Sequence, residues 1–296
     1  MSLILKNVSK SFGTKKAVDN ISLELSKPGV YGLLGTNGAG KTTTIRMILG
    51  ILKKDEGIIT WNGKEVSRKR VNFGYLPEER GVYQKTKIYD QLMYFAELKG
   101  MDKKSADKSI KKWAKELKVE EYLQMTAEKL SKGNQQKIQF MTAIIHNPEL
   151  VILDEPFSGL DPVNTRLLKD IIISLVKDGK YVIMSAHQMA TIEEFCEDIL
   201  ILCKGKTVLQ GKLKEIKETY PVNRMKIDVN QNIDDAISNL GLNIENKVGT
   251  EYTIKIDGAE KAHELLNKMV SQGINVDKFE IMKPTLNDIF IEKVGE

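Results

Sequence analysis

One eight-residue segment constrains this chain more than any other. After a short apolar run at residues 30–34, the sequence continues with Gly35, Thr36, Asn37, Gly38, Ala39, Gly40, Lys41 and Thr42. This order matches G-x-x-x-x-G-K-[ST], a loop whose backbone N–H groups surround phosphate oxygens. Residues 41–52 have a helical pattern, so the loop would end at a helix N-terminus, where unpaired N–H groups and the dipole favour anions. The segment therefore predicts a nucleotide-binding site.

The side chains at the end of this loop have separate expected roles. Lys41 would reach the β- and γ-phosphates, Thr42 would place its hydroxyl on Mg²⁺, and Thr43 could hold the α-phosphate. In a chain of ordinary composition the four specified positions coincide by chance about once in 100 chains. The strand pattern before the loop and the helix pattern after it argue against such a coincidence.

A second candidate site follows another apolar strand pattern, at residues 151–153. Asp154 and Glu155 come directly after it and precede Pro156. In open α/β sheets, ligands bind at the carboxyl ends of the strands. Asp154 would accept from water on Mg²⁺, and Glu155, on the other side of the strand, would act on the attacking water as a general base. The alternative is a pair of carboxylates that only cap a loop.

Length and composition set the general class of protein. A chain of 296 residues predicts two hydrophobic cores, and a composition of 41% hydrophobic and 29% charged residues is that of a globular protein. Two cysteines, Cys196 and Cys203, cannot form a disulfide framework, so a reducing compartment is expected. We find neither a signal-peptide pattern nor an apolar run of the ~20 residues that a membrane helix needs.

The last part of the chain differs from the rest in pattern and charge. After a linker at residues 214–221, the elements expected over residues 222–282 follow the order β-α-β-β-α-β, which predicts a small ferredoxin-like α+β domain. Residues 221–296 contain 9 basic and 13 acidic residues, which leaves 36 basic and 27 acidic residues in the first part. The positive charge of the chain therefore belongs to the part with the phosphate loop.

Further motifs lie between and after these two sites. Residues 130–137, with Ser131 and Gly133, resemble the LSGGQ signature of ABC ATPases and precede a helical pattern. His187 follows a strand pattern and resembles the switch histidine of that family. A third segment resembles the family's D-loop and consists of Ser158, Gly159, Leu160 and Asp161. The resemblance covers about residues 1–215, and five motifs occur in the family's order. The chain is therefore identified as a member of the ABC ATPases.

The resemblance implies an α/β P-loop NTPase core, with a mixed sheet and a helical subdomain at about residues 78–150. The ABC domain would span residues 1–215 and the ferredoxin-like domain residues 216–296. Two ATPase subunits would join head to tail, so that Ser131 and Gly133 of one bind the γ-phosphate on the other. Phe12 would stack on adenine, and His187 would contact the γ-phosphate and orient Glu155 with its water.

Two segments depart from the usual family pattern. Lys132 and Asn134 replace glycine and glutamine in the signature. The segment at residues 74–80 resembles the Q-loop, but Glu78 stands in place of its glutamine; a carboxylate could still meet Mg²⁺ or its water, with a full negative charge. Residues 77–81 and 284–290 resemble bacterial exporter ATPases of the sodium-extrusion and peptide-export type.

The resemblance implies an ATPase that uses ATP and Mg²⁺ and powers an exporter through separate membrane-spanning permease subunits. Its cargo would be ions, antimicrobial or toxin peptides, or drugs, and its place would be the cytoplasmic face of the cell membrane. The second ATPase subunit would be an identical copy or a sibling. The alternative is a non-transport ABC ATPase that acts on nucleic acid or the ribosome. We expect no nucleic-acid partner, because long coiled coils, zinc cysteines and a second ATPase core are lacking. The C-terminal domain would bind a regulator, clamp the dimer or contact the membrane partner, and the alternative is a structural cap.

Overall fold

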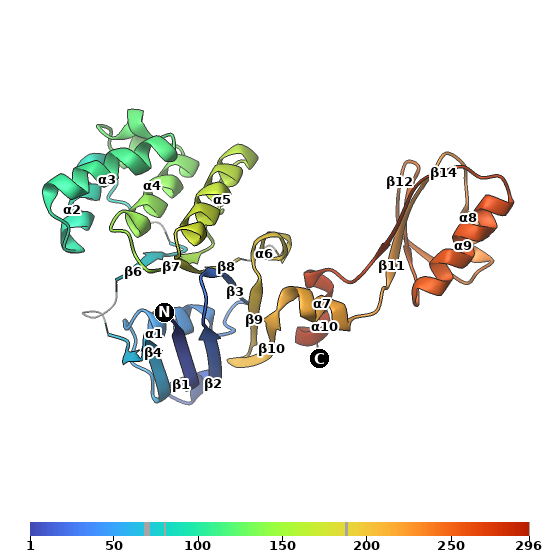
Figure 1. Cartoon of the computed structure of the whole chain (residues 1–296), viewed down its shortest axis with the longest axis horizontal. Helices are drawn as coiled ribbons and strands as arrows, with labels where there is room; N and C mark the ends of the chain where they lie inside the picture. The colour runs from blue at the N-terminus through green and yellow to red at the C-terminus, as the bar shows by residue number, and fades with distance from the viewer. Residues whose placement is uncertain (68–71, 80, 187–188, 296) are drawn as a thin grey trace. The chain divides into compact units, whose positions relative to one another are not determined.

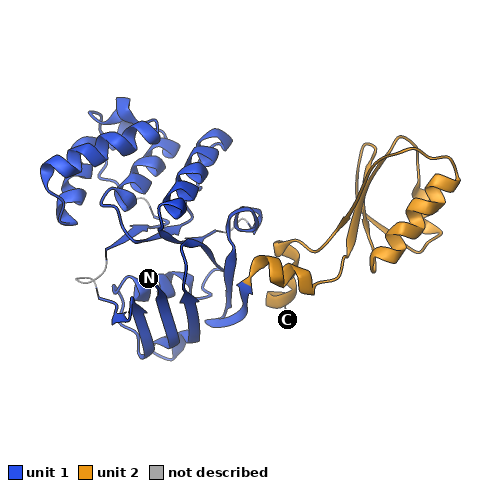
Figure 2. Cartoon of the chain, in the orientation of Figure 1, with its two compact units in different colours: residues 1–211 blue, residues 212–296 orange. Residues whose placement is uncertain are grey.

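The computed structural model describes residues 1–67, 72–79, 81–186 and 189–295. The chain forms two compact units, residues 1–211 and residues 212–296 (Figure 2). The sequence places this boundary four residues later, at 215. The two units are described separately below.

A six-stranded sheet with the strand order β10-β9-β3-β8-β7-β6 lies at the centre of the first unit (Figure 1). Its strands are β3 (Gly29–Gly35), β6 (Phe73–Leu76), β7 (Leu150–Asp154), β8 (Tyr181–Ser185), β9 (Asp198–Cys203) and β10 (Lys206–Lys212). The pairs β3–β8, β3–β9, β6–β7 and β7–β8 are parallel. Every residue of β3, β7 and β8 is buried, which explains their nearly continuous apolar sequences.

An antiparallel sheet with the order β2-β1-β4-β5 shares a hydrophobic core with the parallel sheet. Its strands are β1 (Leu3–Phe12), β2 (Lys15–Leu25), β4 (Glu56–Trp61) and β5 (Lys64–Glu65). Trp61 of β4 makes edge-on ring contacts with Phe73 of β6 and Tyr181 of β8, with ring centres 5.5 and 5.3 Å apart. These contacts join the two sheets, and the helix α1 (Lys41–Ile48) contributes Ile45, Met47 and Ile48 to the same core.

A helical subdomain is inserted between β6 and β7. It contains α2 (Ile88–Leu98), α3 (Lys103–Glu116) and α4 (Lys132–Ile144), with short 3₁₀ turns at Glu120–Tyr122 and Ala127–Lys129. Helix α2 contacts α3 and α4, and α4 contacts β6. The helices α5 (Pro162–Lys177) and α6 (Met189–Phe195) follow β7 and β8. The first unit is therefore the expected α/β core with a mixed sheet and a helical subdomain.

The second unit has the ferredoxin-like order of elements. It contains α7 (Leu213–Thr219), β11 (Arg224–Val229), α8 (Asp234–Ser238), β12 (Asn243–Val248), β13 (Glu251–Lys255), α9 (Ala259–Ser271), β14 (Val276–Met282) and α10 (Leu286–Gly295). Its antiparallel sheet has the order β12-β13-β11-β14. Buried and partly exposed residues alternate along β11, so that Met225, Ile227 and Val229 face a core shared with α8 and α9.

Over the described ranges, the structure contains no helix long and apolar enough to cross a membrane.

Candidate nucleotide site

The loop between β3 and α1 depends on glycine at two positions. Gly35 has φ 149° and Gly40 has φ 105°, in a region that side chains disfavour. A Cβ atom at Gly35 would lie 2.4 Å from the carbonyl oxygen of Leu202, and one at Gly40 would lie 2.5 Å from that of Ala17. Larger residues would therefore push the loop away from β2 and β9. The loop ends on α1, whose first turn has no acidic residue and no side-chain cap, so its N–H groups remain suitable for an anion.

Lys41 lies in the first turn of α1 and folds back over the loop. Its Nζ donates hydrogen bonds to the carbonyl oxygens of Gly35, at 2.7 Å, and Thr36, at 3.2 Å. Burial lowers the pKa of Lys41, while the charges of Asp154, Glu155 and Glu78 oppose that change. The charges of all three carboxylates therefore act on Lys41, although these carboxylates lie at the ends of two different strands.

The carboxylate of Asp154 is held at the end of β7. Asp154 is 4% exposed, and its Oδ1 accepts a hydrogen bond from the Oγ of fully buried Ser185 on β8. The next residue, Glu155, leaves the strand with φ 52°, and its N–H donates to the carbonyl oxygen of Ser185 at 3.2 Å. The positive φ turns the chain sharply after Asp154. A non-glycine residue in this conformation costs of order 1–3 kcal/mol and is typical of functional sites.

These segments surround a cleft of about 510 Å³, a volume in the usual range for small-molecule sites. Among the residues that the sequence singles out, the cleft is lined by Phe12, Asn37, Gly38, Ala39, Gly40, Lys41, Thr42, Thr43, Glu78, Asp154 and Glu155. Gly35 is the last residue of β3, and Thr36 follows it directly before this lining. Phe12 is 51% exposed, which is unusual for a large aromatic side chain and leaves its ring open to a ligand.

Two lining residues escape sequence reasoning, Lys15 and Ala17 of β2. Both lie at the cleft because the hairpin between β1 and β2 pairs Lys15 with Phe12. The signal was the turn at Gly13-Thr14 together with the strand register, which places the residues after a turn opposite those before it. Lys15 adds a positive charge beside the aromatic ring.

The signature segment and the D-loop lie next to each other and do not line this cleft. Ser131 is the N-cap of α4, and its Oγ accepts a hydrogen bond from the N–H of Asn134 at 3.2 Å. A Cβ at Gly133 would lie 3.5 Å from Gly159 and Leu160 of the D-loop. Asp161 caps α5 by accepting from the N–H of Asn164 at 2.9 Å. Ser158 precedes this group, with its N–H donating to the Glu155 carbonyl at 3.2 Å.

Helix α4 connects the signature to the turn at Glu155. Gln136, which is 4% exposed, donates from Nε2 to the carbonyl oxygens of Pro156, at 3.1 Å, and Glu155, at 3.4 Å. The candidate histidine, His187, lies outside the described residues.

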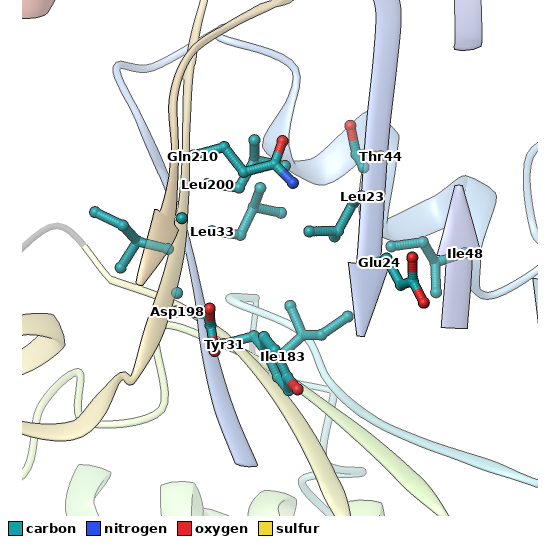
Figure 3. A pocket seen from close by; sticks show the side chains of 13 residues that line it. Leu23, Glu24, Tyr31, Leu33, Thr44, Ile48, Ile183, Asp198, Leu200 and Gln210 are labelled. Atoms are coloured by element: carbon teal, nitrogen blue, oxygen red, sulfur yellow. The ribbon is translucent and has the colours of Figure 1, made fainter. Parts of the chain in front are cut away.

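A second, much smaller cavity lies between β2, β3, β9 and α1 (Figure 3). Its volume is about 50 Å³, with Leu23, Leu33 and Ile48 among its lining residues. Such a space holds a few water molecules and not a nucleotide. The larger cleft is therefore the candidate nucleotide site.

Two protein-family models match the chain, one to each unit. Residues 18–158 match the family described as ABC transporter. Residues 211–294 match the family described as the C-terminal domain of DrrA1-3-like ATP-binding proteins. The first match covers both the phosphate loop and the Asp154 strand end.

Individual proteins extend the similarity over the whole chain. The chain is 47% identical over 294 residues to the ABC transporter ATP-binding protein YhaQ of Bacillus subtilis (strain 168), covering 99% of this chain and 98% of that one. It is 29% identical to the linearmycin resistance ATP-binding protein LnrL of the same organism, covering 98% and 97%. A solved ATP-binding subunit of an ABC transporter superposes with a TM-score of 0.69 at 28% identity, covering 74% and 93%. The chain belongs to the ATP-binding proteins of ABC transporters.

Proposed function

We propose that this chain binds and hydrolyses ATP and thereby powers a bacterial exporter. The observation that carries the proposal is the single cleft that joins the phosphate loop, Asp154 and Glu155. The triphosphate would lie along the loop and the N-terminus of α1, where N–H groups and Lys41 meet its negative charge. Phe12 would stack on the adenine, with Lys15 beside it.

Hydrolysis would use the carboxylate of Glu155 as a general base. The carboxylate accepts a proton from water while the water oxygen attacks the γ-phosphorus, and the bond from that phosphorus to the ADP oxygen breaks. Lys41 would exchange its hydrogen bonds with the carbonyls of Gly35 and Thr36 for phosphate oxygens. In the same proposal, His187 contacts the γ-phosphate and orients the water.

The cleft suits a magnesium ion as well as a nucleotide. Asp154 presents a buried carboxylate that is oriented by Ser185, and the carboxylate of Glu78 and the hydroxyl of Thr42 line the same cleft. We assign Thr42, Asp154 and Glu78 to the ion or its water. Magnesium, when bound, neutralises charge on the β- and γ-phosphates.

The active form would be a head-to-tail dimer, of two copies or of this chain and a sibling. The signature residues Ser131 and Gly133 lie at the start of α4 and outside the cleft lining, which supports a role on a nucleotide held by the other subunit. The adjacent D-loop, Ser158, Gly159, Leu160 and Asp161, would then lie at the same subunit interface.

Membrane-spanning permease subunits would receive the motion of the dimer. Segment 78–128 carries exposed Tyr83, Tyr94 and Leu98, apolar surface that suits a protein contact. The similarity to the linearmycin resistance ATP-binding protein LnrL over 98% of this chain favours export. We propose ions, peptides or drugs as the cargo. The protein would then work at the cytoplasmic face of the membrane.

The test is a Glu155→Gln variant, which keeps the size and hydrogen-bonding capacity of the side chain but cannot accept the proton. We expect it to bind Mg-ATP, accumulate as a dimer, and hydrolyse ATP about 100- to 10,000-fold more slowly. Glu197→Gln is the control, because Glu197 is an exposed glutamate in an ion pair with Lys27. Turnover of Glu155→Gln near the wild-type rate would refute the assignment of the base.

A further inference from the structure

A buried glutamine on α4 holds the segment that carries Glu78. Gln139 is 5% exposed, and its Nε2 donates to the carbonyl oxygen of Pro77 at 3.1 Å and to that of Glu79 at 2.9 Å. These are the carbonyls on either side of Glu78. Two hydrogen bonds from one amide therefore fix the backbone at that residue, which follows β6 and lies outside any helix or strand.

The amide faces the Glu78 segment for a physical reason. Within the residues that the structure describes, the buried Oε1 of Gln139 accepts no hydrogen bond, so both polar contacts of the side chain are made by its nitrogen. A buried amide costs free energy unless it forms hydrogen bonds. Both hydrogen bonds of this amide nitrogen go to the segment that carries Glu78. Only a donor can make these bonds, because both partners are carbonyl oxygens.

The same helix also holds the turn at Glu155. Gln136 and Gln139 are three residues apart and therefore share a face of α4. Gln136 bonds the carbonyls of Glu155 and Pro156, while Gln139 bonds those beside Glu78. One helix thus holds the backbone beside two cleft carboxylates, and the signature residue Ser131 is its N-cap.

We propose that Gln139 is a positioning residue that holds Glu78 for metal and water in the nucleotide cleft and couples it to the signature helix. This inference rests on the proposed ATPase function. Three carboxylates in one cleft repel one another, so Glu78 must be fixed for its charge to act on the metal rather than to disturb Asp154 and Glu155. Gln139, which is 60 positions from Glu79 in the sequence, supplies this restraint.

A double-mutant cycle tests the coupling in the full-length chain. Gln139→Met preserves volume and removes both donors, and Glu78→Ala removes the carboxylate. We expect each single variant to lower the ATP turnover about 10- to 100-fold, the loss associated with misplacing a catalytic group by about 1 Å. The double variant should be no slower than Glu78→Ala, because Gln139 then has no carboxylate to position. Losses that multiply would overturn the proposal.

A second double-mutant cycle measures the requirement for Mg²⁺ in nucleotide binding, without ATP turnover. The Mg²⁺ concentration that gives half-maximal binding of a fluorescent non-hydrolysable ATP analogue should rise in both single variants and rise no further in the double variant. If the wild type binds the analogue but does not hydrolyse ATP, the proposed function fails while this cycle still decides the role of Gln139. Equal Mg²⁺ requirements in Gln139→Met and wild type would refute the positioning role.

Gln91→Met is the matched control for loss of a buried amide. Gln91 is 2% exposed on α2, and its Nε2 donates to the carbonyls of Thr86, at 3.3 Å, and Tyr83, at 3.5 Å. We expect its Mg²⁺ requirement and turnover to match those of the wild type, although its unfolding temperature falls.

Hydrogen exchange in the nucleotide-free chain measures the restraint on the Glu78 segment directly. The backbone amides of Glu78 and Glu79 should exchange faster in Gln139→Met, and unchanged exchange there would contradict the restraint.

Discussion

The two units bury different kinds of side chain. Among the described residues, ten polar or charged side chains are buried in the first unit and none in the second. The second core consists of apolar residues that alternate along strands or recur along helices. Three of the buried polar groups of the first unit, Gln136, Gln139 and Asp154, instead lie at or hold the segments that form the cleft. Because each such group costs free energy unless it is hydrogen-bonded, their concentration in the first unit supports the proposal that this unit performs the chemistry.

The largest effect is expected from a methyl group at the phosphate loop. Gly40→Ala would combine an unfavourable φ with a Cβ 2.5 Å from the Ala17 carbonyl, which must shift β2 or the loop. Strain and overpacking of about 1–3 kcal/mol each predict a loss of ATP affinity of about 100-fold or more. Titration with a fluorescent ATP analogue measures it.

Gly63→Ala separates strain from position. Gly63 has a positive φ, but a Cβ there would meet no atom within 4 Å, and the residue lies outside the cleft lining. We expect a small loss of stability and an unchanged ATP affinity. Equal affinities of Gly40→Ala and Gly63→Ala would show that the close approach to Ala17 is not required.

The apolar core of the second unit should fail without affecting nucleotide binding. Leu265 of α9 is fully buried, so Leu265→Ala should lower the free energy of unfolding of that unit by about 2–5 kcal/mol. Both tryptophans, Trp61 and Trp113, lie in the first unit. Circular dichroism should therefore show an earlier transition while tryptophan fluorescence does not.

Val270→Ala is the control on the same helix, because Val270 is 62% exposed. Its effect should stay within about 0.5 kcal/mol. A fall in ATP affinity with Leu265→Ala would show that the second unit supports the nucleotide site, and would break the separation between the two units.

Acid should weaken the first unit through His146. Burial lowers the pKa of this histidine to about 4, with Lys99 adding to the shift, and the nearby carbonyl of Phe73 opposes it. The folded chain therefore keeps the ring neutral, while the unfolded chain takes up a proton near its ordinary pKa of 6.5. Stability is full above pH 6.5 and is lost as the pH falls towards 4.

Between pH 7.5 and pH 5 this linkage removes about 2 kcal/mol of unfolding free energy. His146→Gln should lose that part of the pH dependence, as measured by urea unfolding with tryptophan fluorescence at both pH values. An unchanged pH dependence would assign the acid sensitivity to other groups.

The smallest effect is expected from the ion network of the second unit. Arg224 of β11 donates from Nε, at 2.5 Å, and Nη2, at 2.9 Å, to Glu245 of β12, and from Nη1 to Asp288 of α10. The guanidinium is partly exposed, so Arg224→Met should lower the unfolding free energy by about 1 kcal/mol, and less at high salt. A loss that 1 M NaCl leaves unchanged would indicate packing instead.

The sequence by itself determined the elements whose chemistry is local. The phosphate loop, the acidic end of β7 and the order of strands and helices in the second unit depend on residues close together in the sequence, so their spacing and pattern were sufficient to predict them. The structure adds that Ser131 and Asp161 each cap a helix, where a short side chain accepts a hydrogen bond from an N–H three residues later.

Only the tertiary structure decided which distant groups meet. The hydrogen bonds of Gln139 to Pro77 and Glu79 join positions about 60 residues apart. Nothing in the sequence distinguishes His146 from other polar residues near a helix end. In the structure it is buried and contacts the carbonyl of Phe73 on β6. The sequence gives the type of a polar residue but not its burial. Only the packing of the folded chain shows which polar side chains are buried and therefore need a hydrogen-bond partner.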